Sequence, residues 1–160
     1  MRLRSRWMVP ALVVLLSASN AEAGLLDDPA PALGSDAAAT VVYRMGAVNY
    51  EPGGWVDTTV TCANLAPDAA TVAIEIFDER DRKVGALAKA TVAAGASVTF
   101  ATSTAAPNAV AIEGLPAIDH GKARVSASTT QLACTGMHHV RGDDGTKKEA
   151  PLELVKKVAF

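Results

Sequence analysis

Two short segments of this sequence alternate apolar and polar residues with a period of two. That is the pattern of a half-buried β-strand, because successive side chains of a strand point to opposite faces. In Trp55–Ala63 the side chains of Val56, Val60 and Cys62 share one face. In Thr71–Phe77 the β-branched residues alternate around a single glutamate. A chain built on such segments must bury one face of each in a sheet, so they constrain the fold more than any other feature.

The remainder of residues 40–160 continues in short runs rich in Val, Ile, Thr and Ala, broken by Gly, Pro, Asn and Asp clusters. The runs predict seven or eight strands and no long helix, which together indicate a single antiparallel β-sandwich. One run, Lys122–Cys134, is irregular, because its apolar residues change parity between Ala127 and Leu132. A bulge or bend in that interval is therefore predicted.

The N-terminus has the three parts of a secretory signal peptide. Three arginines precede a short apolar run, and Ala21 and Ala23 supply the small residues that a signal peptidase reads. The alternative is a membrane anchor, but the apolar run is shorter than the roughly 20 residues that a spanning helix needs. We expect residues 1–23 to be removed, a flexible arm over 24–39, and a sandwich domain over 40–160.

Composition narrows the range of partners. The whole chain carries a formal net charge of −2, and loss of the signal peptide makes it more acidic, at about −4. An acidic surface gives no electrostatic reason to bind nucleic acid, and no second apolar stretch could span a bilayer. We expect a periplasmic or secreted protein whose partner is another protein or an envelope component.

The chain has two cysteines, Cys62 and Cys134. In an exported protein a single pair is most simply one disulfide. The alternative is two free thiols, one of which serves a metal ion.

The run TVTCANLAPDAATVAIEIFDERDRKVGALAKATVAAGASVTFAT resembles the cores of exported bacterial immunoglobulin-like or fibronectin-III-like sandwiches. Its Val92, Gly95, Val98 and Phe100 match the strand that follows the charged hairpin in such domains. The resemblance implies an immunoglobulin-like fold in which the Cys62–Cys134 bridge joins the two sheets. It implies no particular activity, because a sandwich fold hosts many functions.

The stretch CTGMHHVRGDDG, residues 134–145, gathers the most reactive side chains. A copper or zinc site would draw on His120, Met137, His138 and His139. It requires residues 137–139 to form a loop, because adjacent histidines on a strand point to opposite faces. An adhesion tripeptide at 141–143 and a calcium loop built on the acidic runs are further alternatives. The interpretation we favour is a strand end, anchored by the disulfide, that runs into an exposed polar hairpin.

Signatures of common enzyme classes are absent from the sequence, and no cofactor is indicated. The sequence therefore predicts a non-enzymatic exported sandwich that acts through surface or edge-strand contacts with a macromolecular partner. The alternative function is periplasmic binding of copper or zinc. The binding loops that we expect are the two charged tips, namely Asp78, Glu79, Arg80, Asp81 and Arg82, and then Arg141, Asp143 and Asp144.

Overall fold

The two alternating segments form strands within a residue or so of their expected bounds. Trp55–Ala63 corresponds to β2 (Val56–Asn64), and Thr71–Phe77 corresponds to β3 (Ala70–Phe77). This computed structural model describes residues 30–31, 33, 39–53, 55–104, 106–142, 146–152 and 154–157, the last four as backbone alone. The expected signal peptide, together with Asp143 and Asp144, lies outside these residues.

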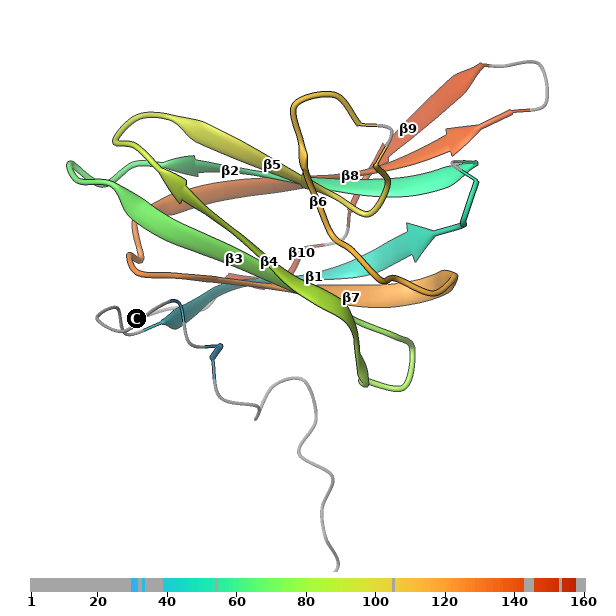
Figure 1. Ribbon diagram of the computed structural model, residues 1–160, viewed down its shortest axis with the longest axis horizontal. Coiled ribbons are helices and arrows are strands. Elements are labelled where there is room, and N and C mark those ends of the chain that lie inside the picture. Colours follow the sequence, from blue (N-terminus) through green and yellow to red (C-terminus); the bar gives the residue numbers. More distant parts are fainter. Residues whose placement is uncertain are drawn as a thin grey trace, which may run out of the picture.

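The strands form two sheets that lie face to face (Figure 1), so the expectation of an all-β fold is confirmed. We call the first sheet A, with the strand order β10-β1-β7-β3-β4. Its members are β1 (Thr40–Tyr50), β3, β4 (Lys83–Val92), β7 (Ile118–Ala127) and β10 (Leu154–Lys157). All the pairings in sheet A are antiparallel.

We call the second sheet B, with the strand order β6-β5-β2-β8-β9. Its members are β2, β5 (Ser97–Ala101), β6 (Val110–Ala111), β8 (Leu132–Arg141) and β9 (Lys147–Pro151). Only the short β5–β6 contact is parallel. The described chain contains no helix of the length and apolar character needed to cross a bilayer.

Ten strands are present in the described residues, where seven or eight were expected. The difference arises where residue patterns are weakest. The irregular Lys122–Cys134 run is two strands, β7 and β8, and the predicted bend between Ala127 and Leu132 carries the chain from sheet A to sheet B. Residues 151–160 were expected to form one last strand, whereas the described C-terminal segment forms two, β9 and β10.

The disulfide between Cys62 and Cys134 is confirmed, but its expected position between the sheets is wrong. Cys62 and Cys134 are directly opposite partners on β2 and β8, which are neighbours within sheet B, and their Cα atoms are 4.1 Å apart. The physical reason is the bend after β7. It turns the chain into sheet B, so Cys134 pairs beside Cys62 and does not face it across the core.

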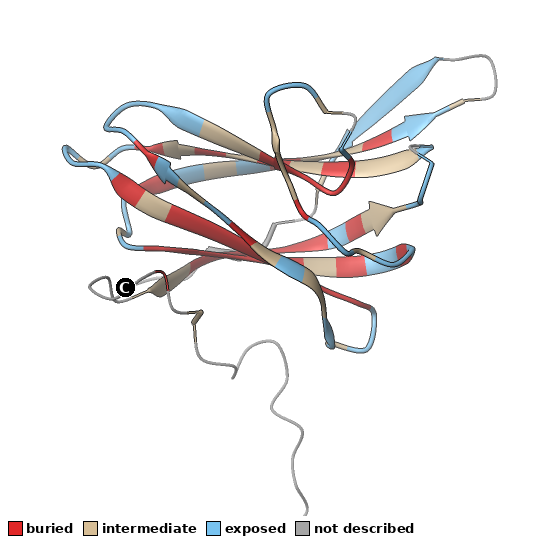
Figure 2. Ribbon diagram, in the orientation of Figure 1, coloured by how far each residue is buried: buried red, intermediate tan, exposed pale blue. Residues whose placement is uncertain are grey.

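The core lies between the sheets and consists mainly of aliphatic side chains. It takes one face of the central strands of both sheets, for example Val72, Ile74 and Ile76 from β3. Figure 2 shows the buried residues concentrated along the central strands of both sheets. Tyr43 also joins this core, and its hydroxyl donates a hydrogen bond to the carbonyl oxygen of Leu132 at 2.8 Å, which links the two sheets.

Candidate functional site at the open end of the sandwich

A cleft of about 780 Å³ lies at one end of the sandwich. Its walls come from five parts of the chain. They are the end of β1 with the following residue (Asn49–Glu51), Val56 of β2, Glu79 of the β3–β4 tip, residues 117–120 at the start of β7, and His138 of β8. We call this surface the open-end cleft. In Figure 1 the strand ends that supply these walls lie at the right-hand end of the molecule.

Hydrogen bonds fix the wall formed by β1. The Thr58 hydroxyl donates to the carbonyl oxygen of Asn49 at 2.9 Å and accepts the backbone N–H of Asn49 at 3.1 Å. The Asn49 side-chain oxygen accepts the backbone N–H of His120 at 2.8 Å. His120 adopts a left-handed backbone with φ of 55°, a conformation that is uncommon for residues other than glycine. These bonds set the start of β7 against the end of β1.

The charge on the cleft is acidic. Glu51, Glu79 and Asp119 line it, and the lining residues that the structure describes include no lysine or arginine. Glu79 has a cationic neighbour outside the lining, since Arg80 lies 3.7 Å away with both side chains largely exposed. Salt screens such an exposed pair strongly, so the cleft retains a negative potential.

His138 faces the cleft opposite Thr58. Its Nδ1 atom is buried and has no hydrogen-bond partner among the described residues. Burial lowers the pKa of His138, the neighbouring His139 lowers it further, and Asp57 opposes both effects. The lowered pKa favours the neutral imidazole, in which one ring nitrogen is a hydrogen-bond donor and the other an acceptor.

His139 occupies the other face of β8 because adjacent residues of a strand point in opposite directions. It is 8% exposed, and both ring nitrogens have partners. Nε2 lies 3.0 Å from the Thr59 hydroxyl, and Nδ1 lies 3.1 Å from a Glu149 carboxylate oxygen. This chain of contacts ties β2, β8 and the edge strand β9 together on the outer face of sheet B.

The metal hypothesis placed Met137, His138 and His139 in a loop, and that placement is wrong. β8 continues through all three residues to Arg141, and β9 begins at Lys147. Strand alternation therefore divides the four residues of the metal hypothesis. His120 and His138 line the cleft, whereas Met137 and His139 lie on the outer face of sheet B. Cys134 is in the disulfide, and no three acidic, histidine or cysteine side chains of the described chain lie close enough to hold a metal ion.

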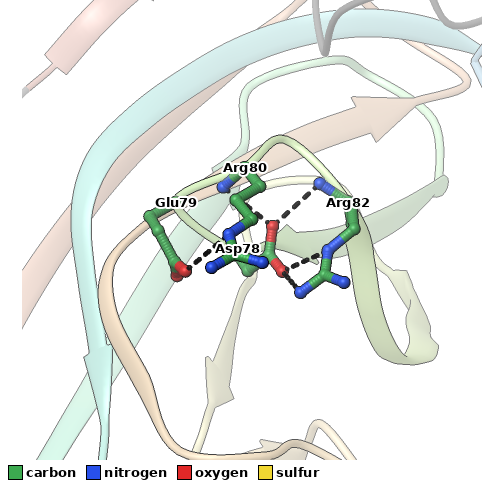
Figure 3. A network of polar contacts seen from close by, with 4 residues as sticks. All are labelled: Asp78, Glu79, Arg80 and Arg82. Carbon is green, nitrogen blue, oxygen red and sulfur yellow. Dashed lines mark hydrogen bonds and ion pairs between the residues drawn. The ribbon is translucent and has the colours of Figure 1, made fainter.

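The β3–β4 tip is more ordered than a solvated charge run. Asp78 is buried, and its carboxylate accepts the backbone N–H groups of Arg80 and Arg82, both at 2.9 Å (Figure 3). The Arg82 side chain also binds this carboxylate at 2.6 Å and 2.8 Å. Burial of Asp78 disfavours its charge, but these hydrogen bonds outweigh that effect and hold its pKa below the usual value. The fixed tip presents Glu79 to the cleft.

Sequence reasoning named His120 and His138 as possible metal ligands and Glu79 as part of a separate binding loop, and it did not place the three residues at one site. It missed Glu51 and Asp119 as parts of one surface, since they are distant in sequence and meet only through the β1–β7 pairing. The other expected contact residue that is described, Arg141, is exposed at the end of β8, where its N–H donates to the Trp55 carbonyl oxygen at 2.7 Å.

No family model and no curated protein matches this chain. A solved structure, described as the crystal structure of Thermotoga maritima 1070, is similar to it with a TM-score of 0.48 and 9% sequence identity. The likeness covers 75% of this chain and 99% of the other. It assigns no function, so the functional argument rests on the cleft itself.

Proposed function

We propose that the protein is a non-enzymatic, exported binding protein whose open-end cleft receives a cationic segment of a macromolecular partner. The observation that carries this proposal is the cleft itself, which combines three carboxylates with a neutral imidazole and has no basic residue in its described lining. A lysine or arginine side chain complements such a surface in charge and in hydrogen bonding.

Exposed apolar side chains next to the cleft support this proposal. Trp55 is 47% exposed, and Val140, opposite the cleft residue Val56, is also exposed. Tryptophan is enriched at protein interfaces because its large side chain supplies contact area at low entropic cost. An apolar rim beside an acidic hollow suits a basic segment that also carries apolar residues.

The edge strand β9 is a weaker candidate for partner contact. It is exposed along its whole length and contains Lys147, Lys148 and Pro151. Lysine and proline on an edge strand hinder pairing with a further strand. The cleft therefore accounts for a specific partner better than edge-strand addition does.

One set of polar contacts resembles the catalytic residues of hydrolases, but it lies outside the open-end cleft. Thr59, His139 and Glu149 are linked in the order hydroxyl, imidazole, carboxylate, as in hydrolases that use a serine nucleophile. They lie on the outer face of sheet B, whereas the cleft lies on its inner face. This separation of the hydroxyl from the cleft supports a binding role over a hydrolytic one.

Two general features of the fold, the disulfide and the two packed sheets, support the proposed export and the immunoglobulin-like classification. A disulfide persists in an oxidising compartment such as the periplasm or the extracellular medium. Two mainly antiparallel sheets packed face to face are the architecture that immunoglobulin-like domains share.

A titration with a hexalysine peptide tests the cleft. We expect saturable binding that weakens at least about fivefold in a Glu51→Gln/Asp119→Asn variant and at higher salt. The matched control is Asp68→Asn, which removes an exposed carboxylate from the β2–β3 connection and leaves the cleft intact. Absence of saturable binding, or an equal loss in the control, would contradict the proposal.

Binding of copper or zinc is a second candidate, favoured by one observation. His120 and His138 both line the cleft, and the buried Nδ1 of His138 has no partner in the described chain. Native mass spectrometry with added Cu²⁺ or Zn²⁺ separates the two functions. One bound ion per chain, lost in His138→Ala and retained in Met137→Leu, would support the metal function. Equal retention in both variants would exclude His138 as a ligand.

A further inference from the structure

The outer face of sheet A is buried, although it points away from the core. On β3, the residues that alternate with the core positions are Ala73, Glu75 and Phe77, and each is at most 3% exposed. On β7, Arg124 and Ser126 are equally buried. The outer face of sheet B differs, since Ala133 and Thr135 there are exposed. Some further segment must therefore cover sheet A.

Leu33 is the described residue that fits this role. It is only 5% exposed, yet it does not belong to the cluster of buried side chains between the sheets. Ala30 and Pro31, three and two residues before it, are half-buried. In Figure 1 the segment that holds these residues lies on the side of sheet A away from sheet B.

The geometry allows Leu33 to reach the most deeply buried part of this face. Strand β1 begins at Thr40, next to a row in which Val41 pairs with Ser126 and Ser126 pairs with Ala73. The six residue steps from Leu33 to Ala39 span up to roughly 20 Å, and β3 lies two strands away from β1, roughly 10 Å. Ala73 and Ser126 have small side chains, so they project little from the face and are both buried.

The chemistry of the face is also complementary to the arm. Among the described residues of this face, Arg44, Arg124 and Lys83 lie near one carboxylate, Glu75, which Arg124 binds at 2.7 Å and 2.9 Å and Lys83 at 2.9 Å. The face therefore has an excess of positive charge. Residues 24–39 contain three aspartates and no basic residue. The Ser126 hydroxyl is buried without a partner among the described residues, as expected beneath an apolar cover.

We propose that the outer face of sheet A is a docking surface for an acidic, extended segment, and that the chain's own arm occupies it through Leu33. Leu33 sits over Ala73 and Ser126, and the aspartates of the arm meet the positive potential of Arg44 and Arg124. The arm is then a removable cover, since electrostatic attraction between an exposed arm and a surface weakens as salt rises. This surface is separate from the open-end cleft, and the proposal does not depend on the function proposed for the cleft.

A disulfide trap in the full mature chain tests the position of the arm. The Leu33→Cys/Ala73→Cys variant should form a second disulfide in air, seen as loss of two hydrogens and as a linked peptide in a non-reducing digest. The matched control, Leu26→Cys/Ala73→Cys, should link at least about fivefold less. Retention of the native Cys62–Cys134 bridge in the same digest shows that each variant has folded. No link from position 33, or equal links from both positions, would overturn the proposal.

Hydroxyl-radical footprinting of the unmodified chain gives a second, independent test. Leu65 is 62% exposed and serves as the internal reference. We expect Leu33 to be labelled at least about fivefold more slowly than Leu65 at low salt, and faster as salt is added. Equal labelling of the two leucines at low salt would overturn the proposal, even if the cysteine variants failed to fold.

Discussion

At the scale of single residues, Asn64 organises one end of the sandwich. It is fully buried at the end of β2. Its side-chain nitrogen donates to the carbonyl oxygens of Asp68 at 2.8 Å and Val92 at 3.0 Å. Its side-chain oxygen accepts the N–H of Ala66 at 3.0 Å. One side chain thus joins the β2–β3 connection to the end of β4, and it satisfies backbone groups that would otherwise lack partners.

We predict that Asn64→Ala lowers the free energy of unfolding by about 2–3 kcal/mol, because it leaves buried backbone groups unsatisfied. Urea denaturation monitored by Trp55 fluorescence measures the loss. Thr135→Ala, at an exposed position of β8, is the control and should change stability by less than about 0.5 kcal/mol. A loss for Asn64→Ala as small as that of the control would show that water replaces these hydrogen bonds.

His138 links a single residue to the pH dependence of stability. Its pKa is lowered in the folded protein by burial and by His139, relative to the usual value of 6.5. Between the two pKa values the unfolded chain binds more protons than the native one, so stability rises with pH. The stability that the protein gains from keeping His138 neutral is therefore complete above about pH 6.5. It is lost as the pH falls below that value.

We predict that wild type, compared with a His138→Gln variant, loses stability as the pH falls from 7.5 to 5. The difference between the two urea midpoints isolates this one group, since His120 and His139 remain in both proteins. A difference that stays constant over this range, or that grows in favour of wild type as the pH falls, would show that His138 is not desolvated.

At the scale of elements, alternation locates strands but does not pair them. The bounds of β2 and β3 were predictable because each segment has a regular apolar face and clear turn residues at both ends. The partner of Cys134 was predictable because only two cysteines exist, yet the sheet that holds it was not. A strand's neighbours depend on contacts between residues far apart in the sequence, and residue periodicity carries no information about them.

The site shows the same division between local and long-range information. His120, His138 and Glu79 were recognisable as residue types in polar segments, but the cleft exists only because the ends of β1, β3 and β8 meet the start of β7. The Met137–His139 group was misplaced for a local reason. The metal hypothesis required these residues to form a loop, whereas the Val140–Val56 pairing extends the strand through them.

Two glycines show how closely the elements approach. A Cβ atom on Gly121 of β7 would lie 2.7 Å from the carbonyl oxygen of Phe77 and 3.3 Å from that of Val48, and backbone atoms cannot rotate away. A Cβ atom on Gly136 of β8 would meet the side chain of Leu152, which is able to move. Gly121 therefore permits close packing of β7 on its neighbours, and Gly136 makes room for the segment after β9.

We predict that Gly121→Ala lowers the free energy of unfolding by about 1–3 kcal/mol through overpacking. Gly136→Ala should lower the free energy of unfolding by less than Gly121→Ala does. Its main effect should be faster hydrogen exchange, confined to residues 147–152. Denaturant unfolding and peptide-level hydrogen exchange on both variants provide the measurements. If both variants lost equal stability and β9 kept its protection, the distinction between backbone and side-chain contact would be wrong.

At the scale of the whole molecule, two surfaces lie apart from the shared core. The open-end cleft lies at one end of the sandwich, and the buried outer face lies on sheet A. The core between them is largely aliphatic, with many alanine and valine side chains that each bury limited area. Packing alone gives such a domain only a small free energy of unfolding, so a covalent link contributes a large share of its net stability.

The Cys62–Cys134 disulfide supplies that link, with a sequence separation of 72 residues. The loop that it closes restricts the unfolded chain, and the chain-entropy account gives about 4 kcal/mol for a loop of this length. We predict that Cys62→Ala/Cys134→Ala lowers the free energy of unfolding by about that amount, measured by urea denaturation. The control is Thr61→Ala/Thr135→Ala, the adjacent cross-strand pair on the other face of the same two strands. It alters the same strands without opening the loop and should cost less than about 1 kcal/mol. Equal losses in the two variants would show that cross-strand packing, rather than loop closure, is what the disulfide contributes.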